Sequence, residues 1–283
     1  MSASSQANRN GRPVAVVVGA TSKWQADGAN TRLVHGGAAV SDAEVPPSAR
    51  WGAGGAIAQK FAQEGFFIAM TTRARANAEA LAQTIRDEGG EGMIVEMDLA
   101  KPATIVAAFD EIRREAGEPE VLVYNAGYLE GRQLPREMEL LEFFPDEMFE
   151  TAIDIACRGP FLVAKEVLPS MRQKGRGSIL FTNNPASLRG RKRGHGHSLY
   201  YPRGMVRALS QVLTEEYTEH GVHVANIIID GVIDAPGIRG IYGDNPVMDP
   251  AKIAETLFLL HAQDPSCWTH EIQLTPAPRP PSV

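Results

Sequence analysis

Two glycine-rich segments of this chain together have the composition of one phosphate-binding loop. Residues 14–18 are apolar and predict a short buried strand, which ends in Gly19-Ala20-Thr21. A helix start of the matching type, Gly52-Ala53-Gly54-Gly55, follows only after a long polar stretch. Glycines let a backbone come close to a ligand, and the free N–H groups and dipole of a helix N-terminus favour an anion. The chemistry predicted by these residues is binding of a dinucleotide pyrophosphate.

A second segment with chemical potential is the basic run 189–197, which contains three further arginines or lysines after Arg189 and two histidines, His195 and His197. One interpretation is recognition of an anionic substrate, with either histidine acting as an acid or base near neutral pH. The alternative is a solvated basic loop, and the composition favours this alternative.

Alternating strands and helices must position these segments. The apolar patterns predict strands at 14–19, 66–71, 93–97, 121–124, 178–182, 222–229 and 271–274, and helices at 55–64, 76–88, 104–115, 146–173, 204–219 and 252–262. Such alternation is typical of an α/β fold in three layers, with a doubly wound parallel sheet and right-handed crossovers.

The predicted organisation is one domain, 13–275, between a flexible N-terminal tail, 1–12, and a proline-rich, extended C-terminal tail, 276–283. An insertion, 22–51, separates the two glycine segments. It has few large apolar side chains and so cannot form a core of its own. It is either a lid over the bound nucleotide, with Lys23 or Arg50 touching phosphate, or a surface excursion whose two ends simply meet.

Composition narrows the class of protein. The net charge of −6 over 283 residues argues against a nucleic-acid or anionic-membrane partner. No apolar run approaches the roughly 20 residues of a membrane span, and the N-terminus has no signal-peptide core. The two cysteines, Cys157 and Cys267, have neither zinc-site nor disulfide-framework spacing, so we expect no metal site and a cytoplasmic location.

Several short motifs occur in a recognisable order. They are the three glycines Gly19, Gly52 and Gly54, then Asp98-Leu99, Asn125-Ala126-Gly127, Gly159-Pro160-Phe161-Leu162 and Arg207-Ala208-Leu209-Ser210. With these motifs the chain resembles the short-chain dehydrogenase/reductase family from about residue 14 to residue 274. The resemblance implies a Rossmann-type fold, hydride transfer between a nicotinamide and a carbonyl or alcohol carbon of a small substrate, and a homodimer or homotetramer formed through the long helices.

The resemblance also implies residue roles at a nucleotide site. Gly19, Gly52 and Gly54 would line the diphosphate, together with Thr21 and Arg50 beside them. The remaining cofactor contacts would be Asp98 and Leu99 at the adenine, Asn125, Ala126 and Gly127 beneath the adenosine ribose, and backbone of Val232 and Ile233 at the nicotinamide amide.

The choice of cofactor depends on the end of the second strand. An NAD site places a carboxylate there, but this chain reads Thr71-Thr72-Arg73-Ala74-Arg75. A guanidinium matches the geometry of a phosphate, so the two arginines Arg73 and Arg75, with Thr72 before them, favour NADP (as NADPH) over NAD. The alternative is that the arginines belong to a solvated loop.

The chain departs from the family at its catalytic set of Asn, Ser, Tyr and Lys. Matching positions hold Ala156 for the Asn, Asn184 or Ala186 for the Ser, Leu199 for the Tyr and Arg203 for the Lys. Tyr200 is our candidate proton donor, although Tyr201 could replace it. Arg203 would hold the ribose and supply a positive field, and Ser187 or Asn184 would polarise the substrate oxygen.

These departures leave two other functions open. One is a nucleotide-binding protein without hydride chemistry, and the other is a non-redox enzyme that resembles halohydrin dehalogenases with their Ser, Tyr and Arg set. Asp230 and Asp234 follow the sixth strand, where the family carries Pro-Gly after the strand. They are either acids of the cleft or caps of the next turn.

Overall fold

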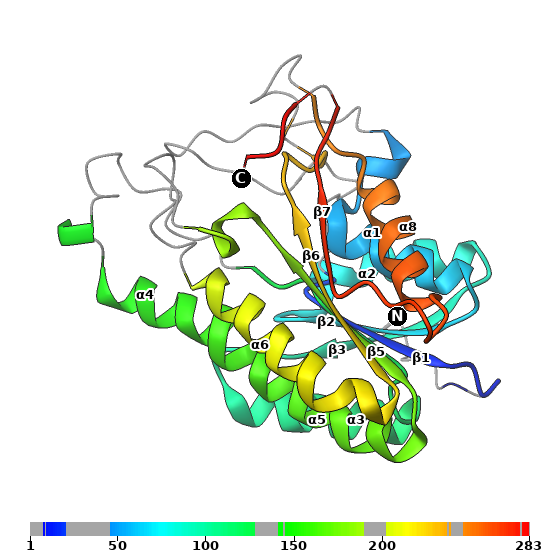
Figure 1. The fold of residues 1–283 in the computed structure, drawn as a ribbon. Coiled ribbons are helices and arrows are strands. Elements are labelled where there is room, and N and C mark those ends of the chain that lie inside the picture. The colour runs from blue at the N-terminus through cyan, green and yellow to red at the C-terminus, as the bar shows by residue number, and fades with distance from the viewer. Residues whose placement is uncertain are drawn as a thin grey trace.

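The computed structural model describes residues 8, 10–20, 46–127, 141–143, 145–189, 202–236, 238, 246–277 and 279–282. Its centre is one parallel sheet of seven strands in the order β3-β2-β1-β4-β5-β6-β7 (Figure 1). The strands are β1 (Val14–Val18), β2 (Phe67–Thr72), β3 (Glu91–Glu96), β4 (Val121–Tyr124), β5 (Gly177–Asn183), β6 (Val222–Ile229) and β7 (Glu271–Leu274).

Helices cover both faces of the sheet (Figure 1). On one face lie α1 (Gly52–Gln63), α2 (Glu79–Asp87) and α8 (Pro250–His261). The other face carries α3 (Pro102–Glu115), α4 (Asp146–Ile153), α5 (Gly159–Lys174) and α6 (Arg203–Tyr217). The predicted three-layer α/β fold is therefore confirmed.

The sheet is apolar on both sides because each side packs on helices. In β1, Val14, Val16 and Val18 pack toward α3 and α5, whereas Ala15 and Val17 pack toward α1 and α8. This alternation follows from the two-residue period of a strand. All five residues are buried, which explains why β1 reads as a continuous apolar run.

The predicted single helix 146–173 is wrong in its middle. A π-helical turn, Asp154–Arg158, separates α4 from α5. The Tyr124 hydroxyl donates a hydrogen bond to the Ile155 carbonyl in this turn (2.5 Å). Gly159 follows, and a Cβ there would lie 2.8 Å from both the Tyr124 hydroxyl and the Asp154 carbonyl oxygen. The approach of β4 to the helix thus requires a glycine and a widened turn.

The position of β1 defines where a ligand would bind. From β1 the chain runs outward to β2 and β3, then returns to β4 on the other side of β1. In doubly wound sheets such a reversal leaves a crevice beyond the carboxyl ends of the two central strands. In the part of the chain that the structure describes, no helix is long and apolar enough to cross a membrane.

Candidate nucleotide and active site

The two glycine segments meet at this crevice. Gly19 follows β1 with φ of +84°, and Gly52 begins α1 with φ of +62°. A Cβ on Gly54 would lie only 2.3 Å from the Gly19 carbonyl oxygen, and a Cβ on Gly19 would lie 2.9 Å from Ala126 Cα. The first turn of α1 and the turn after β1 can approach this closely only because both positions are glycine.

Asn125 connects the glycine turn to the neighbouring strands. Its Nδ2 donates to the Gly19 carbonyl (3.3 Å), and its Oδ1 accepts from the Thr182 hydroxyl at the end of β5 (3.0 Å). The side-chain amide is therefore held at both ends. This geometry brings the carboxyl ends of β1, β4 and β5 together around one crevice.

This arrangement fits a dinucleotide. The glycine cradle, in which side chains at Gly19 and Gly54 would clash, leaves backbone exposed to a ligand, and the N-terminus of α1 supplies an anion-favouring dipole. Arg50 stands just before this helix and is partly buried. The predicted contact Thr21 lies outside the described residues.

The end of β2 holds the residues that were expected to select the cofactor. Thr72 is buried, and its hydroxyl donates to the Ala74 carbonyl (3.3 Å). The Arg75 guanidinium donates to the Ile94 carbonyl (2.6 Å), so it lies against β3. Arg75, one of the two arginines expected at the phosphate, is thus hydrogen-bonded to β3, and Arg73 directly follows β2 and is exposed.

Asp98 and Leu99 follow β3 at the same edge of the sheet. The Asp98 carboxylate accepts from the Ala100 backbone N–H (3.1 Å) and forms an ion pair with Lys101 (3.2 Å). Leu99 is buried in the hydrophobic core. Asp98 thus caps its own turn. An adenine in the position implied by the family resemblance would lie against this turn.

Arg203 begins α6 and reaches into the crevice. Its guanidinium donates to the Thr182 carbonyl (3.4 Å) and lies so close to Gly127 that a Cβ there would be 2.3 Å from one guanidinium nitrogen. Burial lowers the pKa of Arg203, while the adjacent Tyr124 acts in the opposite direction. A guanidinium nevertheless stays protonated near neutral pH. Among the described residues, no carboxylate forms an ion pair with Arg203.

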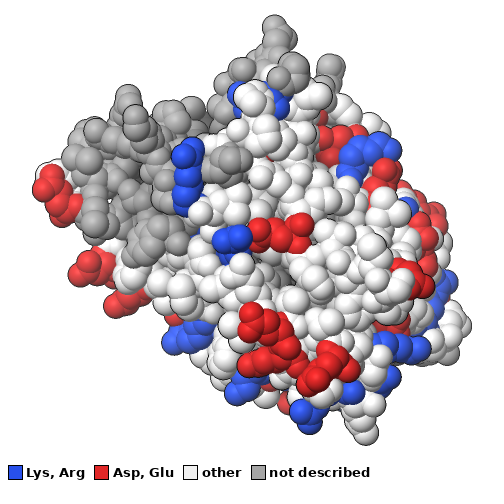
Figure 2. Space-filling model, viewed as in Figure 1, with Lys and Arg blue, Asp and Glu red and all other residues white. Residues whose placement is uncertain are grey.

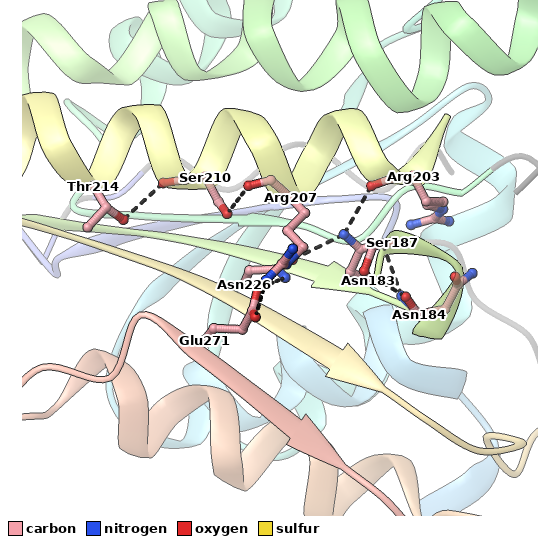
Figure 3. Close-up of polar contacts among 9 residues, drawn as sticks. All are labelled: Asn183, Asn184, Ser187, Arg203, Arg207, Ser210, Thr214, Asn226 and Glu271. Atoms are coloured by element: carbon pink, nitrogen blue, oxygen red, sulfur yellow. Dashed lines mark hydrogen bonds and ion pairs between the residues drawn. The ribbon is translucent and has the colours of Figure 1, made fainter. Parts of the chain in front are cut away.

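Asn184 and Ser187 lie together in the turn after β5 (Figure 3). Asn184 Oδ1 accepts from the Ala186 N–H (3.0 Å), and the Ser187 hydroxyl donates to the Asn184 carbonyl (2.8 Å). A hydroxyl has a single proton to donate, so Ser187 in this geometry has none for a substrate oxygen. The Asn184 NH₂ group is therefore the better donor of the two.

A polar network that the sequence analysis missed fixes the start of α6. Asn183 Nδ2 donates to the Arg203 carbonyl (3.3 Å) and to Asn226 Oδ1 (3.1 Å), as Figure 3 shows. Asn226 Nδ2 donates to Glu271, which also pairs with Arg207 through two hydrogen bonds of 2.7 and 2.9 Å. The sequence feature that could have predicted this network is Asn226, because an amide side chain within the otherwise largely apolar strand β6 needs hydrogen-bonding partners.

The turn after β6 borders the crevice from the other side. The Val232 carbonyl accepts from the Met248 N–H (2.7 Å), and Ile233 pairs with Met248 in an isolated bridge. Asp230 and Asp234, on either side of these residues, are both buried. The described candidates thus lie along the carboxyl edge of the sheet, from β3 to β6. Tyr200, Tyr201, His195 and His197 lie outside the described residues.

Comparison with known proteins identifies the family of this chain. The model of the enoyl-(acyl carrier protein) reductase family matches residues 48–257, most of the chain. The chain belongs to the short-chain dehydrogenase/reductase family. An uncharacterized oxidoreductase of Bacillus subtilis is 28% identical over 200 residues, which cover 70% of this chain and 69% of that protein. The 3-oxoacyl-(acyl carrier protein) reductase of Escherichia coli is 26% identical over 193 residues, 68% of this chain and 74% of that protein.

Solved structures agree on the fold. An alcohol dehydrogenase from Thermococcus sibiricus, complexed with 5-hydroxy-NADP, superposes with a TM-score of 0.70 at 22% identity and covers 96% of this chain and 99% of its own. A metagenomic short-chain oxidoreductase in complex with NADP gives a TM-score of 0.67 at 23% identity, with 93% and 96% covered. The chain is an oxidoreductase of the short-chain dehydrogenase/reductase type.

Proposed function

We propose that this short-chain dehydrogenase/reductase prefers NADPH and interconverts a carbonyl compound and an alcohol. The glycine cradle at the carboxyl ends of β1 and β4 carries the nucleotide part of the proposal. The preference for NADPH is supported by Arg73 and by the lack of a carboxylate among Thr71, Thr72 and Arg73 at the end of β2.

The nicotinamide, when bound, supplies or takes up the hydride. The protein binds the diphosphate at Gly19 and Gly54, orients the adenosine on the turn that begins with Asn125, and positions the substrate oxygen near the turn after β5. Asn184 then donates a hydrogen bond through its NH₂ group to that oxygen, which stabilises the charge that develops on it.

Tyr200 is the proposed proton donor, and Arg203 supports it. The guanidinium brings a fixed positive charge to the crevice and binds ribose hydroxyls, and its pKa excludes it as a proton donor. A nearby cation lowers the pKa of a phenol, because it favours the charged form. The site therefore still contains a cation, which is the guanidinium of Arg203 in place of the usual lysine ammonium.

Titration with NADPH and NADH, followed by nicotinamide fluorescence, tests the proposal. We expect tighter binding of NADPH. Replacement of Arg73 by Ala should weaken NADPH binding about tenfold and leave NADH binding unchanged, because a hydrogen-bonded charge contributes about 1.5–3 kcal/mol. Arg75→Ala is the matched control: Arg75 donates to the Ile94 carbonyl, so the ratio of the two affinities should persist. Equal binding of both cofactors by the wild-type protein would refute the preference.

We further propose a homo-oligomer formed through the helices α4, α5 and α6. Large apolar side chains are exposed on all three, among them Phe161 (49%), Met205 (51%) and Val212 (48%). Light scattering should show a dimer or tetramer, and Phe161→Glu should reduce its mass, because a carboxylate would have to be buried at the contact. A monomeric wild-type protein would contradict this proposal.

A further inference from the structure

Asp230 has a function that neither the nucleotide site nor the catalytic set explains. It stands directly after β6 and is 6% exposed. Its Oδ2 accepts from the Ser282 backbone N–H (2.6 Å) and from Gln273 Nε2 (2.8 Å), and its Oδ1 accepts from the Ser282 hydroxyl (2.5 Å). A single carboxylate therefore holds both donors of Ser282.

The neighbouring glycine shows that the C-terminal segment is closely packed here. A Cβ on Gly231 would lie 2.9 Å from Pro276 Cδ and 2.7 Å from Met248 Sδ. Any larger residue would push the segment away from the turn after β6. Asp230 thus binds the C-terminal segment through its carboxylate, and Gly231 lets the same segment pack closely because it has no side chain.

The C-terminal segment also contacts the turn after β5. The Arg189 guanidinium donates to the Ser282 carbonyl (3.0 Å). Arg189 follows the turn that contains Asn184 and Ser187, and Asp230 precedes Val232 and Ile233. Ser282 therefore bridges the segments that follow β5 and β6, and Figure 1 shows the C-terminal end beyond the carboxyl ends of these two strands.

We propose that Asp230 and Ser282 form a clasp, and that this clasp holds residues 276–277 and 279–282 across the entrance to the substrate side of the site. The clasp makes Asp230 a positioning residue that governs access to the site. The role of the clasp in access to the site rests on the proposed function, because the proposed function places the nicotinamide and the substrate beneath this segment.

Two variants release the clasp from opposite sides. Asp230→Asn removes the charge with little change of shape, and Ser282→Pro removes both the backbone N–H and the hydroxyl donor. Ser282 lies near the end of the chain, so its replacement leaves the core intact. Asp110→Asn, at an exposed position of α3, controls for loss of a surface charge, and Ser282→Gly keeps the backbone donor.

Hydrogen exchange of the protein without cofactor provides the first measurement. Both releasing variants should exchange about tenfold faster at the Arg279 amide and at the Ser187 and Leu188 amides, because hydrogen bonds to a charged group are lost and the cover opens. Acrylamide quenching of bound NADPH provides the second. The quenching constant should rise in both releasing variants and rise less in Ser282→Gly, which keeps one of the two donors, whereas Asp110→Asn should match the wild-type protein.

The outcomes separate the clasp from the cofactor proposal. Unchanged exchange at Arg279 would overturn the clasp. Faster exchange there, with no change at Ser187 and Leu188 and no change in quenching, would overturn its role at the entrance. If the wild-type protein binds no NADPH, the proposed function fails, and the exchange of the apo-protein alone decides the clasp.

Discussion

At the scale of single residues, the site differs from its family in a consistent way. Arg203 stands in the lysine position and Asn184 in a serine position, and the structure places both at the crevice. The hydrogen-bonding groups of the usual set are thus partly replaced by an amide and a guanidinium. Neither can transfer a proton near neutral pH, so the proton must come from elsewhere.

Replacement of Tyr200 by Phe is therefore expected to lower turnover about 10² to 10⁴-fold, the usual contribution of a positioned acid or base. NADPH affinity, measured by fluorescence, should stay unchanged. Tyr201→Phe is the matched control on the adjacent residue. Full activity of Tyr200→Phe, together with a large loss in Tyr201→Phe, would assign the proton transfer to Tyr201.

Residue roles were harder to predict from sequence than residue positions. The motif around Asn125 marks a turn, but the pairing of its side chain with Thr182 depends on two strands that are distant in sequence. Similarly, the preference for Asn184 over Ser187 follows from the direction of one hydroxyl. Such directions depend on tertiary contacts, so spacing alone leaves both residues as candidates.

At the scale of elements, the approach of α1 to β1 is the most demanding contact of the site. Gly54→Ala would place a methyl group 2.3 Å from the Gly19 carbonyl oxygen. We expect a loss of about 1–3 kcal/mol in unfolding free energy, typical of overpacking, and a clear loss of NADPH affinity. Urea unfolding and cofactor titration measure the two effects.

Gly204→Ala is the control for this substitution, because no atom lies within 4 Å of a Cβ at that helical position in α6. It should stabilise the protein by about 0.5–1 kcal/mol, since alanine favours a helix more than glycine does. Equal NADPH affinity in Gly54→Ala and the wild-type protein would show that the close approach has no role in binding.

The elements themselves could largely be predicted from sequence. Apolar runs predicted the bounds of β4 and β6 to the residue, because strands buried on both faces contain few polar residues. The bounds of β7, a partly exposed edge strand, were also predicted to the residue. The π-helical turn 154–158 could not be predicted, because its cause is the Tyr124 hydroxyl on a distant strand. The start of α1 at Gly52 was placed three residues too late, since glycine disfavours a helix by local propensity.

At the scale of the whole molecule, the net charge is −6 over 283 residues. Figure 2 shows acidic and basic side chains interspersed on the face in view, without a broad basic field. Two histidines, His223 and His261, lie where β6, β7 and α8 meet. There His223 stacks on Trp268 with ring centroids 4.9 Å apart, and His261 Nδ1 lies 2.9 Å from the Ser178 hydroxyl.

These histidines predict a loss of stability at acidic pH. Burial lowers the pKa of His223 and of His261 below the ordinary value of 6.5. His270 lowers the pKa of His223 further, and Glu120 raises the pKa of His261, but both effects are weaker than that of burial. The unfolded chain therefore binds protons at these histidines before the folded protein does. Their contribution to the free energy of unfolding is complete above about pH 6.5, and it falls as the pH decreases from 6.5 toward the lower pKa values of the folded protein.

Urea unfolding at several pH values measures this dependence. The wild-type protein should lose stability from pH 7.5 to pH values below 6.5. His223→Phe keeps an aromatic ring against Trp268 and should show a shallower decline, whereas His220→Asn, at the end of α6, should retain the wild-type slope. A slope that is the same in all three proteins would exclude His223 as a source.

The separation of the two glycine segments has a consequence for the energetics of folding. Gly19 and Gly52 stand 33 positions apart. Closing so long a loop costs about 2 kcal/mol more than closing a four-residue turn, because each doubling of length adds roughly 0.6 kcal/mol. A nucleotide that binds only the closed arrangement contributes about 2.7 kcal/mol when its free concentration is 100 times Kd. The bound nucleotide therefore offsets this additional cost of closing the longer loop.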